Sequence, residues 1–330
     1  MDLCMRMRID SGHIGLRIQV QIVTYNSANV IRACLDAVTS QTARIERVVV
    51  IDNGSEDDTL GIVEAGRVDV VPIGRNIGYA SGHNVGFRMA IDRGMDVVIT
   101  LNPDVVLDSE YVAKAIESLC ADASIGGVTG KLCRPDGRLD SAGLEMWSFY
   151  HVRDRGSEQK DDNRWSGMCE VWGVCGAAAV YRVAMLKDVM LRSGDILDSV
   201  FFLYKEDVDL CWRARQFAWR FLYNPDAVAI HGRGWKRGTR PSVIATGHSF
   251  ANQIALLVRH VPTFSFGVVM AICVELGRYM MLALKRPNVW WFATRLIVAH
   301  WRYHWRVRSE LVARKGAGRE SHDFCYPSHI

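Results

Sequence analysis

Two hydrophobic periods alternate along residues 18–120. Unbroken apolar runs rich in β-branched residues predict buried strands at 18–25, 47–51, 68–73 and 96–101. Apolar residues spaced three or four apart predict helices at 28–40, 57–65, 81–93 and 109–120. This alternation predicts an α/β fold with a mostly parallel, Rossmann-like sheet flanked by helices. Because the strands are apolar throughout, both faces of the sheet should be covered.

The pattern changes after residue 120. Strands are expected at 126–132 and 172–181, and the charged stretch 153–164 is expected to be a mobile loop. From residue 262 onward, long apolar segments rich in Trp and Arg predict a C-terminal helical appendage. We therefore expect three parts, which are a lead-in at 1–17, a main domain at 18–260 and a helical region at 261–330.

Composition narrows the class of protein. The chain has 330 residues, about half of them hydrophobic, which suffices for one large α/β domain and an appendage. The net charge of +4 is too small to indicate nucleic acid, and no nucleic-acid-binding motif accompanies it. The excess Arg and Lys lie in the last third beside aromatic residues, which favours an anionic membrane surface.

Cysteine usage and the N-terminus indicate the compartment. The nine cysteines include no C-x-x-C pair, which is typical of buried thiols in a reducing cytosol. No continuous apolar run precedes Ile18, so we expect no secretory signal.

Polar clusters follow three of the predicted strands, at residues 24–26, 52–53 and 102–104. Ligands of open α/β sheets bind outside the carboxyl ends of the strands, which is where these clusters should meet. A single Asp there can be a helix cap. Carboxylates at successive strand ends can instead hold a hard cation against substrate phosphates, and Pro103 would fix the turn that presents Asp104.

Two later segments also carry candidate chemistry. In 201–210 (FFLYKEDVDL), aromatic residues run directly into Glu206 and Asp207. These acids can simply favour the start of a helix, or one of them can be a desolvated general base. His231 follows an apolar run, where it is either a structural residue or a metal ligand.

Seven motifs occur in one order along residues 18–235: IVTYNSANVIRACLDAV, VVVIDNGSEDDT, RNIGYASGHNVGF, LNPDV, GAAAVYR, FFLYKEDVDLCWRAR and AIH. This series resembles the inverting family-2 glycosyltransferases with the GT-A fold, most of all their rhamnosyltransferase-like branch. A dehydrogenase is disfavoured because its G-x-G-x-x-G fingerprint is missing from these motifs.

The resemblance implies roles for individual residues. The donor nucleotide would be bound by Thr24, Tyr25, Asn26, Asp52, Asn53, Arg75, Asn76, Gly78, Asn84 and Asn102. The donor or acceptor sugar would lie against Gly176, Ala177 and Trp172. The metal ligands would be Asp104 and His231, and the catalytic carboxylates would be Asp207 and Glu206. Asn102 stands where the family's D-x-D motif has its first Asp, so Asp104 becomes the principal metal ligand.

The implied reaction moves a sugar from a nucleotide-diphosphate donor to an acceptor hydroxyl with inversion. Mg²⁺ or Mn²⁺ would stabilise the leaving diphosphate, and Asp207 would take the proton of the hydroxyl. By resemblance, rhamnose is the first candidate sugar, and the acceptor is a polysaccharide or a lipid-linked glycan. An oligomer is compatible with these features.

Two alternative functions fit parts of the sequence, a nucleotidyltransferase and a catalytically inactive scaffold. A nucleotidyltransferase would need a Gly-rich phosphate loop bearing Lys or Arg after the first strand, where this chain has TYNSAN. A catalytically inactive membrane-associated scaffold would be expected to lack a carboxylate at 104 or 207, and both are present.

The C-terminal region predicts peripheral attachment to the cytoplasmic face of a membrane. Residues 264–284 are apolar and long enough to span, but Glu275 and Arg278 make lying on the surface more favourable. The following stretch places aromatic or apolar side chains near one helical face and Arg side chains in a stripe. These are Trp290, Ile297, Trp301 and Trp305, and Arg295, Arg302 and Arg306. The alternative is that these helices pack on the main domain or on a second subunit.

Overall fold

The computed structural model describes residues 15–66, 68–232, 242–261 and 265–316. Most of the predicted lead-in and the first residues of the predicted C-terminal segment lie outside these ranges. The strands are β1 Ile18–Thr24, β2 Arg47–Asp52, β3 Asp69–Pro72, β4 Val97–Leu101, β5 Val105–Leu107, β6 Ile125–Cys133, β7 Leu139–Ser141, β8 Leu144–Met146, β9 Val152–Asp154, β10 Cys169–Val171, β11 Ala178–Arg182 and β12 Arg220–His231.

The helices alternate with the early strands as predicted and then gather at the C-terminus. They are α2 Ile31–Thr39, α3 Thr59–Glu64, α4 Tyr79–Asp92, α5 Tyr111–Cys120, α6 Val183–Asp188, α7 Glu206–Gln216, α8 Val243–His260, α9 Phe266–Lys285 and α10 Pro287–Gly316. Short 3₁₀ turns are η1 Ser148–Tyr150, η2 Asn163–Trp165 and η3 Ser199–Phe201. All four early strands and all four early helices are confirmed.

One large sheet runs in the order β10-β12-β6-β11-β4-β1-β2-β3, with β5 beside β12 and β7 beside β6. β1 to β4 are parallel to one another, as predicted. The sheet is more mixed than the early pattern indicated, because β11 runs antiparallel to both β4 and β6. The α/β fold class is confirmed. The antiparallel strand β11 begins beside Leu101, at the carboxyl end of β4, and runs back along β4.

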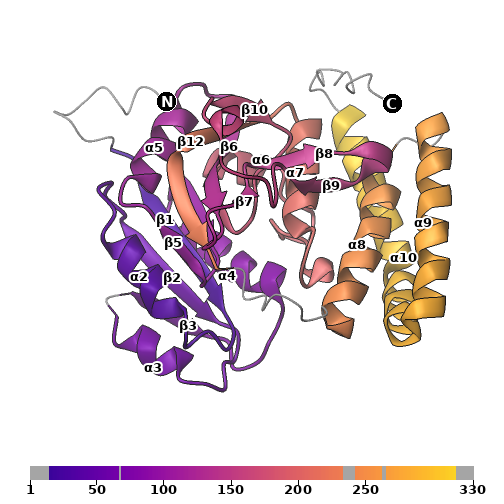
Figure 1. Cartoon of the computed structure of the whole chain (residues 1–330), viewed down its shortest axis with the longest axis horizontal. Coiled ribbons are helices and arrows are strands. Elements are labelled where there is room, and N and C mark those ends of the chain that lie inside the picture. The colour runs from indigo at the N-terminus through magenta and orange to yellow at the C-terminus, as the bar shows by residue number, and fades with distance from the viewer. Residues whose placement is uncertain (1–14, 67, 233–241, 262–264, 317–330) are drawn as a thin grey trace.

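Helices cover both faces of the sheet. One apolar cluster joins α2, α3 and α5 to one face, and a second joins α4, α6 and α7 to the other. The helices α8, α9 and α10 stand together at the end of the molecule far from β2 and β3, next to α7 (Figure 1).

The charged stretch 153–164, expected to be a mobile loop, is partly ordered into elements. It begins inside the β8–β9 hairpin and ends in η2. Its charges are paired, as in the ion pair of Arg153 with Glu145 at 2.7 Å. Pairing of this kind is not visible in local sequence, because the partners belong to neighbouring segments.

The C-terminal helices differ in how much they bury. α8 packs along α10, and α9 buries only Ala271 and Glu275 of its side chains. Glu275 and Arg278, three residues apart on α9, form an ion pair at 2.9 Å. Among the described residues, α9 is the one helix that is long and apolar enough to cross a membrane.

Candidate active site

The end of β1 presents an aromatic ring to solvent. Tyr25 is 45% exposed, and its neighbour Asn26 has a left-handed φ of 51°. The Asn26 Oδ1 accepts a hydrogen bond from the backbone N–H of Glu56 at 2.8 Å, which stabilises that turn. The buried hydroxyl of Thr24 has no hydrogen-bond partner in the structure. An exposed ring beside an unpaired hydroxyl can stack on and hydrogen-bond to a nucleoside.

Asp52 shapes the turn after β2. Its carboxylate accepts hydrogen bonds from the backbone N–H groups of Gly54 and Ser55 at 3.2 and 3.0 Å, and from the Ser55 hydroxyl at 2.5 Å. The side chain is buried. Asp52 therefore holds the loop at the predicted nucleotide edge, and its contact with a base remains a prediction.

The loop before α4 is held against the turn after β2. The Asn53 Nδ2 donates to the Gly78 carbonyl at 3.0 Å. Gly78 has φ 89°, and a Cβ there would come within 2.5 Å of the Phe202 ring, so only glycine fits. Arg75 and Asn76 lie exposed on the same loop. Their exposure leaves them available to an anionic ligand.

Asn84 is buried, and its amide is used inside the protein. Its Oδ1 accepts from the backbone N–H groups of Ile196 and Leu197, both at 3.0 Å. Its Nδ2 donates to the Leu197 carbonyl at 2.6 Å and to the Ser199 hydroxyl at 3.2 Å. These contacts show that the amide holds the loop of residues 196–199, and its predicted contact with the donor remains a prediction.

Asp104 and His231 come together, as the metal hypothesis requires. The Oδ1 of Asp104 lies 3.4 Å from the Nε2 of His231, because β5 pairs with the end of β12. The Asn102 Nδ2 lies 3.5 Å from the same nitrogen, and the Asn102 Oδ1 is buried without a partner. On the other side of the ring, Nδ1 lies 2.7 Å from the buried Asp140 carboxylate.

This arrangement fits a divalent cation. A carboxylate at Nδ1 stabilises the histidine tautomer whose Nε2 can bind a metal. Burial lowers the pKa of His231, but its hydrogen bonds with Asp104 and Asp140 outweigh burial and raise the pKa to about 9. A cation beside Asp104 would displace that proton. Among the described residues no three His, Cys, Asp or Glu side chains converge as a metal site, so a bound diphosphate would have to complete the ligand shell.

Asp207 and Glu206 begin α7 and differ in their surroundings. The Asp207 Oδ2 accepts the Gly176 N–H at 3.0 Å, and its Oδ1 accepts the Val208 N–H at 2.8 Å. The buried Oε2 of Glu206 has no partner. Burial, with the adjacent charge of Asp207, raises the pKa of Glu206 to about 8. Burial also raises the pKa of Asp207, and the Gly176 hydrogen bond opposes this.

These contacts assign the ionised form to Asp207. Two backbone N–H groups stabilise a carboxylate, whereas a buried oxygen without a donor favours the protonated acid. At neutral pH Glu206 is therefore mostly protonated, and Asp207 is the better candidate for a general base.

Two consecutive backbone groups link this base to the metal turn. Gly176 donates to Asp207, and the carbonyl of Ala177 accepts the N–H of Asn102 at 2.9 Å. The Gly176 carbonyl is occupied by the Tyr79 hydroxyl at 3.0 Å. Residues 176–177 thus connect Asp207 to the Asn102 turn, and we call them the floor of the site; their contact with a sugar remains a prediction.

Trp172 makes its described ring contact away from Gly176 and Ala177. It is half-buried and packs edge-on against Trp212, with ring centroids 5.5 Å apart. No described contact joins it to the donor side, so its sugar contact remains a prediction.

The loop that leads into Asp207 is strained and is held from outside. Phe202, Tyr204 and Lys205 have left-handed φ angles of 60°, 67° and 68°. The Nδ2 of Asn252, on α8, lies 2.9, 3.0 and 2.8 Å from the carbonyls of residues 201, 203 and 204. Non-glycine residues in this region cost free energy, so the backbone conformation depends on such contacts.

A buried ionic network fixes α7 to the C-terminal helices. Asp209 pairs with Arg213 at 2.8 Å and with Arg259 at 3.0 Å, and its Oδ1 lies 2.9 Å from His260. Arg259 also pairs with Asp198 at 2.7 Å. Burial would raise the pKa of Asp209, but Arg213 and Arg259 hold it well below its ordinary value. The helix that begins with the base is therefore anchored by α8.

Sequence reasoning missed Asp140, Asn252 and the Asp209 network. Asp140 lies 91 residues from its histidine partner, and Asn252 lies 48 to 51 residues from the carbonyls it binds. The only local signal is a lone polar residue inside an apolar run, which is too common to indicate a site.

The sequence of this chain is similar to that of a known protein family and of a curated protein. A family model described as glycosyl transferase family 2 matches residues 19–190. A curated relative from Mycobacterium tuberculosis, N-acetylglucosaminyl-diphospho-decaprenol L-rhamnosyltransferase, is 26% identical over 276 residues, covering 73% of this chain and 84% of the relative.

Solved structures show the same fold. The mannosyltransferase PcManGT from Pyrobaculum calidifontis, solved with GDP-Man and Mn²⁺, has a TM-score of 0.54 at 18% identity, over 90% of this chain and 85% of that one. Staphylococcus aureus TarS 1-349 with UDP-GlcNAc has a TM-score of 0.53 at 16% identity, over 92% and 93%. GalNAc-T7, solved with UDP, GalNAc and Mn²⁺, has a TM-score of 0.58 at 14% identity and covers 76% of this chain, which spans about half (48%) of GalNAc-T7.

Proposed function

Because the chain belongs to glycosyl transferase family 2 and has the GT-A fold, it is a glycosyltransferase, and we propose that it inverts the anomeric centre of the sugar it transfers. The proposed donor is a nucleotide-diphosphate sugar, with rhamnose as the first candidate, and the proposed acceptor is a hydroxyl of a lipid-linked glycan. The M. tuberculosis relative supports both choices, since it is named as a rhamnosyltransferase that acts on a diphospho-decaprenol-linked sugar.

The observation that carries the proposal is the link between base and metal turn through residues 176–177. Asp207 is held by the Gly176 N–H at 3.0 Å, and Ala177 holds Asn102 at 2.9 Å. A general base and a diphosphate site on opposite sides of one rigid floor suit in-line displacement. Attack from the face opposite the leaving group inverts the anomeric carbon.

Asp207 would take the proton of the acceptor hydroxyl as the hydroxyl attacks the anomeric carbon. A raised pKa makes this carboxylate a stronger base, while the two backbone N–H groups keep it ionised near neutral pH. Glu206, whose pKa is about 8, stays mostly protonated and does not compete for the proton.

Asp104 and His231 would hold a divalent cation, Mg²⁺ or Mn²⁺, with the unpartnered Asn102 Oδ1 beside them. When bound, the cation supplies positive charge that stabilises the leaving diphosphate. Asp140 would keep Nε2 of His231 free to bind it, through the contact at Nδ1. The Mn²⁺ in two solved structures of the same fold supports this choice of cofactor.

The exposed apolar side chains of α9 and α10 support the proposal of peripheral attachment at the cytoplasmic face of a membrane. Leu284 and Phe266 are 81% and 74% exposed, and Trp291 is 58% exposed. Arg295 and Arg302 lie exposed on α10, where they can meet anionic lipid. Attachment would bring the enzyme to the surface that holds a lipid-linked acceptor.

A panel of sugar nucleotides with Mn²⁺ tests the function. The true donor at a hundred times its dissociation constant should stabilise the protein by roughly 2.7 kcal/mol in thermal unfolding. The same donor should be consumed when a polyprenyl-diphosphate glycan is added. Consumption of no sugar nucleotide with any glycan acceptor would contradict the proposal.

A further inference from the structure

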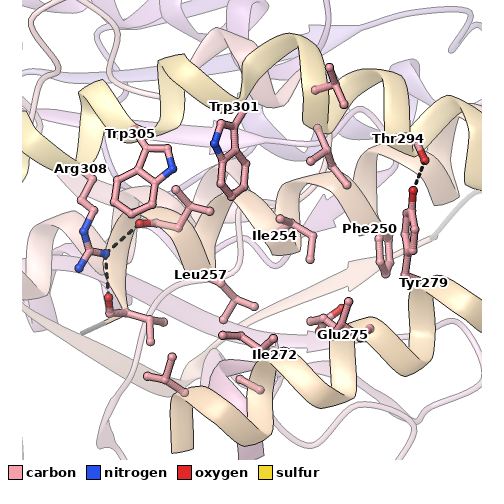
Figure 2. A pocket seen from close by; sticks show the side chains of 17 residues that line it. Phe250, Ile254, Leu257, Ile272, Glu275, Tyr279, Thr294, Trp301, Trp305 and Arg308 are labelled. Carbon is pink, nitrogen blue, oxygen red and sulfur yellow. Dashed lines mark hydrogen bonds between the residues drawn. The ribbon is translucent and has the colours of Figure 1, made fainter. Parts of the chain in front are cut away.

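The three C-terminal helices enclose an apolar groove. It has a volume of about 540 Å³ and lies between α8, α9 and α10 (Figure 2). Its walls include Phe250, Ile254, Leu257, Ile272, Trp301 and Trp305. Pockets lined by apolar and aromatic side chains bind apolar ligands and hold water poorly.

The few polar side chains in the wall are already paired. The Tyr279 and Thr294 hydroxyls lie 2.7 Å apart, and Arg308 donates to two carbonyls near the C-terminal end of α8 at 2.8 and 2.7 Å. Glu275 lies 2.6 Å from the Nε2 of His151. A ligand in the groove therefore meets mainly carbon, which fits a hydrocarbon chain better than a sugar or a peptide backbone.

α8 connects this groove to the catalytic loop. One face of the helix lines the groove with Phe250, Ile254 and Leu257. The opposite face carries Asn252, which holds the loop before Asp207. The groove therefore begins one helix thickness from the acceptor side of the active site.

Cations lie where the groove approaches the active site. Arg278 pairs with the lining residue Glu275 at 2.9 Å, and its side chain is 44% exposed. Lys205, immediately before the two catalytic carboxylates, is close enough to Arg278, Glu275 and Asp207 for their charges to act on it. Arg278 also lies beside the groove residue Phe250, with its guanidinium carbon 5.6 Å from the ring centroid. Two cations therefore lie near the groove wall and the candidate base, and the charge of Glu275 offsets them in part.

We infer that the groove between α8, α9 and α10 binds the isoprenoid chain of a polyprenyl-diphosphate-linked acceptor, with its diphosphate beside Arg278 and Lys205. The inference rests on the proposed function and adds a site for the lipid part of the acceptor. The order of groups matches the molecule, since hydrocarbon, cations and base follow one another as chain, diphosphate and glycan do. A second copy of this chain or bilayer acyl chains would fill the groove without using these cations.

Binding of an isoprenoid diphosphate tests the site without catalysis. Farnesyl diphosphate should bind the full chain about a hundredfold tighter than inorganic pyrophosphate in isothermal titration calorimetry, because most of its gain comes from buried carbon. The double variant Ile272→Gln, Leu276→Gln should bind farnesyl diphosphate about tenfold more weakly. Both positions line the groove and are exposed at 51% and 58%, so the substitutions should be tolerated.

A matched control lies on the same helix. Met280→Gln, Leu284→Gln changes side chains that are 64% and 81% exposed and do not line the groove. This variant should bind farnesyl diphosphate as the wild type does. Equal affinities in both double variants, or no binding by the wild type, would overturn the inference.

Kinetic and light-scattering measurements distinguish an isoprenoid in the groove from a second copy of the chain or bilayer acyl chains. The groove variant should raise the KM for a decaprenyl-diphosphate glycan about tenfold and leave the KM for the same glycan diphosphate with a methyl ester unchanged. Loss of a dimer by light scattering, or loss of flotation with liposomes while farnesyl diphosphate binding is kept, would assign the groove to a second copy or to the bilayer and overturn the inference. Failure of all sugar transfer with intact farnesyl diphosphate binding would instead refute the proposed function.

Discussion

Asn252 is predicted to be a positioning residue for the catalytic base, although it lies on α8 outside the sheet domain. Its amide nitrogen contacts the carbonyls of residues 201, 203 and 204 at 2.8 to 3.0 Å. Replacing it by alanine removes every one of these donors. The Phe201 carbonyl keeps the Leu203 N–H at 2.6 Å, so the loss falls mainly on the carbonyls of residues 203 and 204. A buried carbonyl left without a donor costs about 1–3 kcal/mol, and Tyr204 is exposed enough for water to compensate in part. We expect Asn252→Ala to lower the free energy of unfolding by about 2–3 kcal/mol.

The catalytic effect should exceed the effect on stability. Phe202, Tyr204 and Lys205 have left-handed φ angles, and three such residues store roughly 3–6 kcal/mol of strain. The hydrogen bonds of Asn252 oppose this strain. Without them the loop should relax to a less strained backbone conformation. Lys205 directly precedes the helix that presents Asp207, and a displacement of about 1 Å can cost on the order of 10² in rate. We therefore expect kcat to fall about a hundredfold.

Asn224→Ala is the matched control. Asn224 is also a buried asparagine, and its Nδ2 donates to the Lys114 carbonyl at 3.1 Å and the Ser118 hydroxyl at 2.8 Å. It should lose similar stability in urea unfolding and keep its kcat, because it lies on β12 and contacts α5 instead of the loop before Asp207. Transfer rates at saturating donor, measured where both variants are fully folded, decide the matter. Equal kcat values for the two variants would refute the positioning role.

Four further predictions concern the carboxylates. Asp207→Asn should lower kcat by on the order of 10² to 10⁴ while donor affinity stays near normal, and near-wild-type turnover would contradict its role as base. Asp104→Ala should abolish transfer in a folded protein, and full wild-type activity in excess EDTA would contradict the metal. The charge of Asp154 adds to burial in raising the pKa of Asp207, so Asp154→Asn should move the acidic limb of the kcat/KM profile to lower pH, and an unmoved limb would count against this. Asp209→Asn should destabilise the protein by about 3–5 kcal/mol in denaturant titration at neutral pH. Because the folded pKa of Asp209 is depressed, this difference is present above the unfolded pKa of about 4 and should shrink as pH falls below it, and a difference independent of pH would exclude the ionic explanation.

The first hundred residues of the main domain could be predicted because each element obeys its own hydrophobic period. The strands β1, β2 and β4 are buried throughout or nearly so, and this burial is why their sequences are mainly apolar. The buried Gln19 of β1 is an exception, and its Nε2 donates to the Gly86 carbonyl at 2.9 Å. β5, β7 and β10 could not be predicted, because three residues are too few to show a period. β5 and β10 both pair with β12, which is far away in sequence, whereas β7 pairs with its near neighbour β6.

The candidate site divides in the same way. Asp104, Asp207 and His231 stand in recognisable motifs, and the structure brings Asp104 and His231 to within 3.4 Å. Asp140 and Asn252 carry no motif, since each acts through a single contact made by the folded chain. Asn84 stands in a motif, and its amide holds the loop of residues 196–197, a role that the motif does not indicate.

The family match ends at residue 190, yet much of the catalytic geometry comes from beyond it. Asp207 and His231 follow that segment in the chain, and Asn252 lies further still on α8. The matched segment supplies the strand ends, the Asn102–Asp104 turn and the floor at 176–177, which together form the proposed nucleotide side. The unmatched segment supplies the proposed base, its loop, the helices that hold it, and His231, the second proposed metal ligand. A fold divided in this way can keep one mode of nucleotide binding while the acceptor side varies, although β12 pairs with β6 as well as with β5 and the Phe202 carbonyl accepts the Tyr79 N–H at 2.7 Å. Specificity for the acceptor should therefore depend on α7 to α10, and exchange of these helices with those of a relative should change the acceptor without changing the donor.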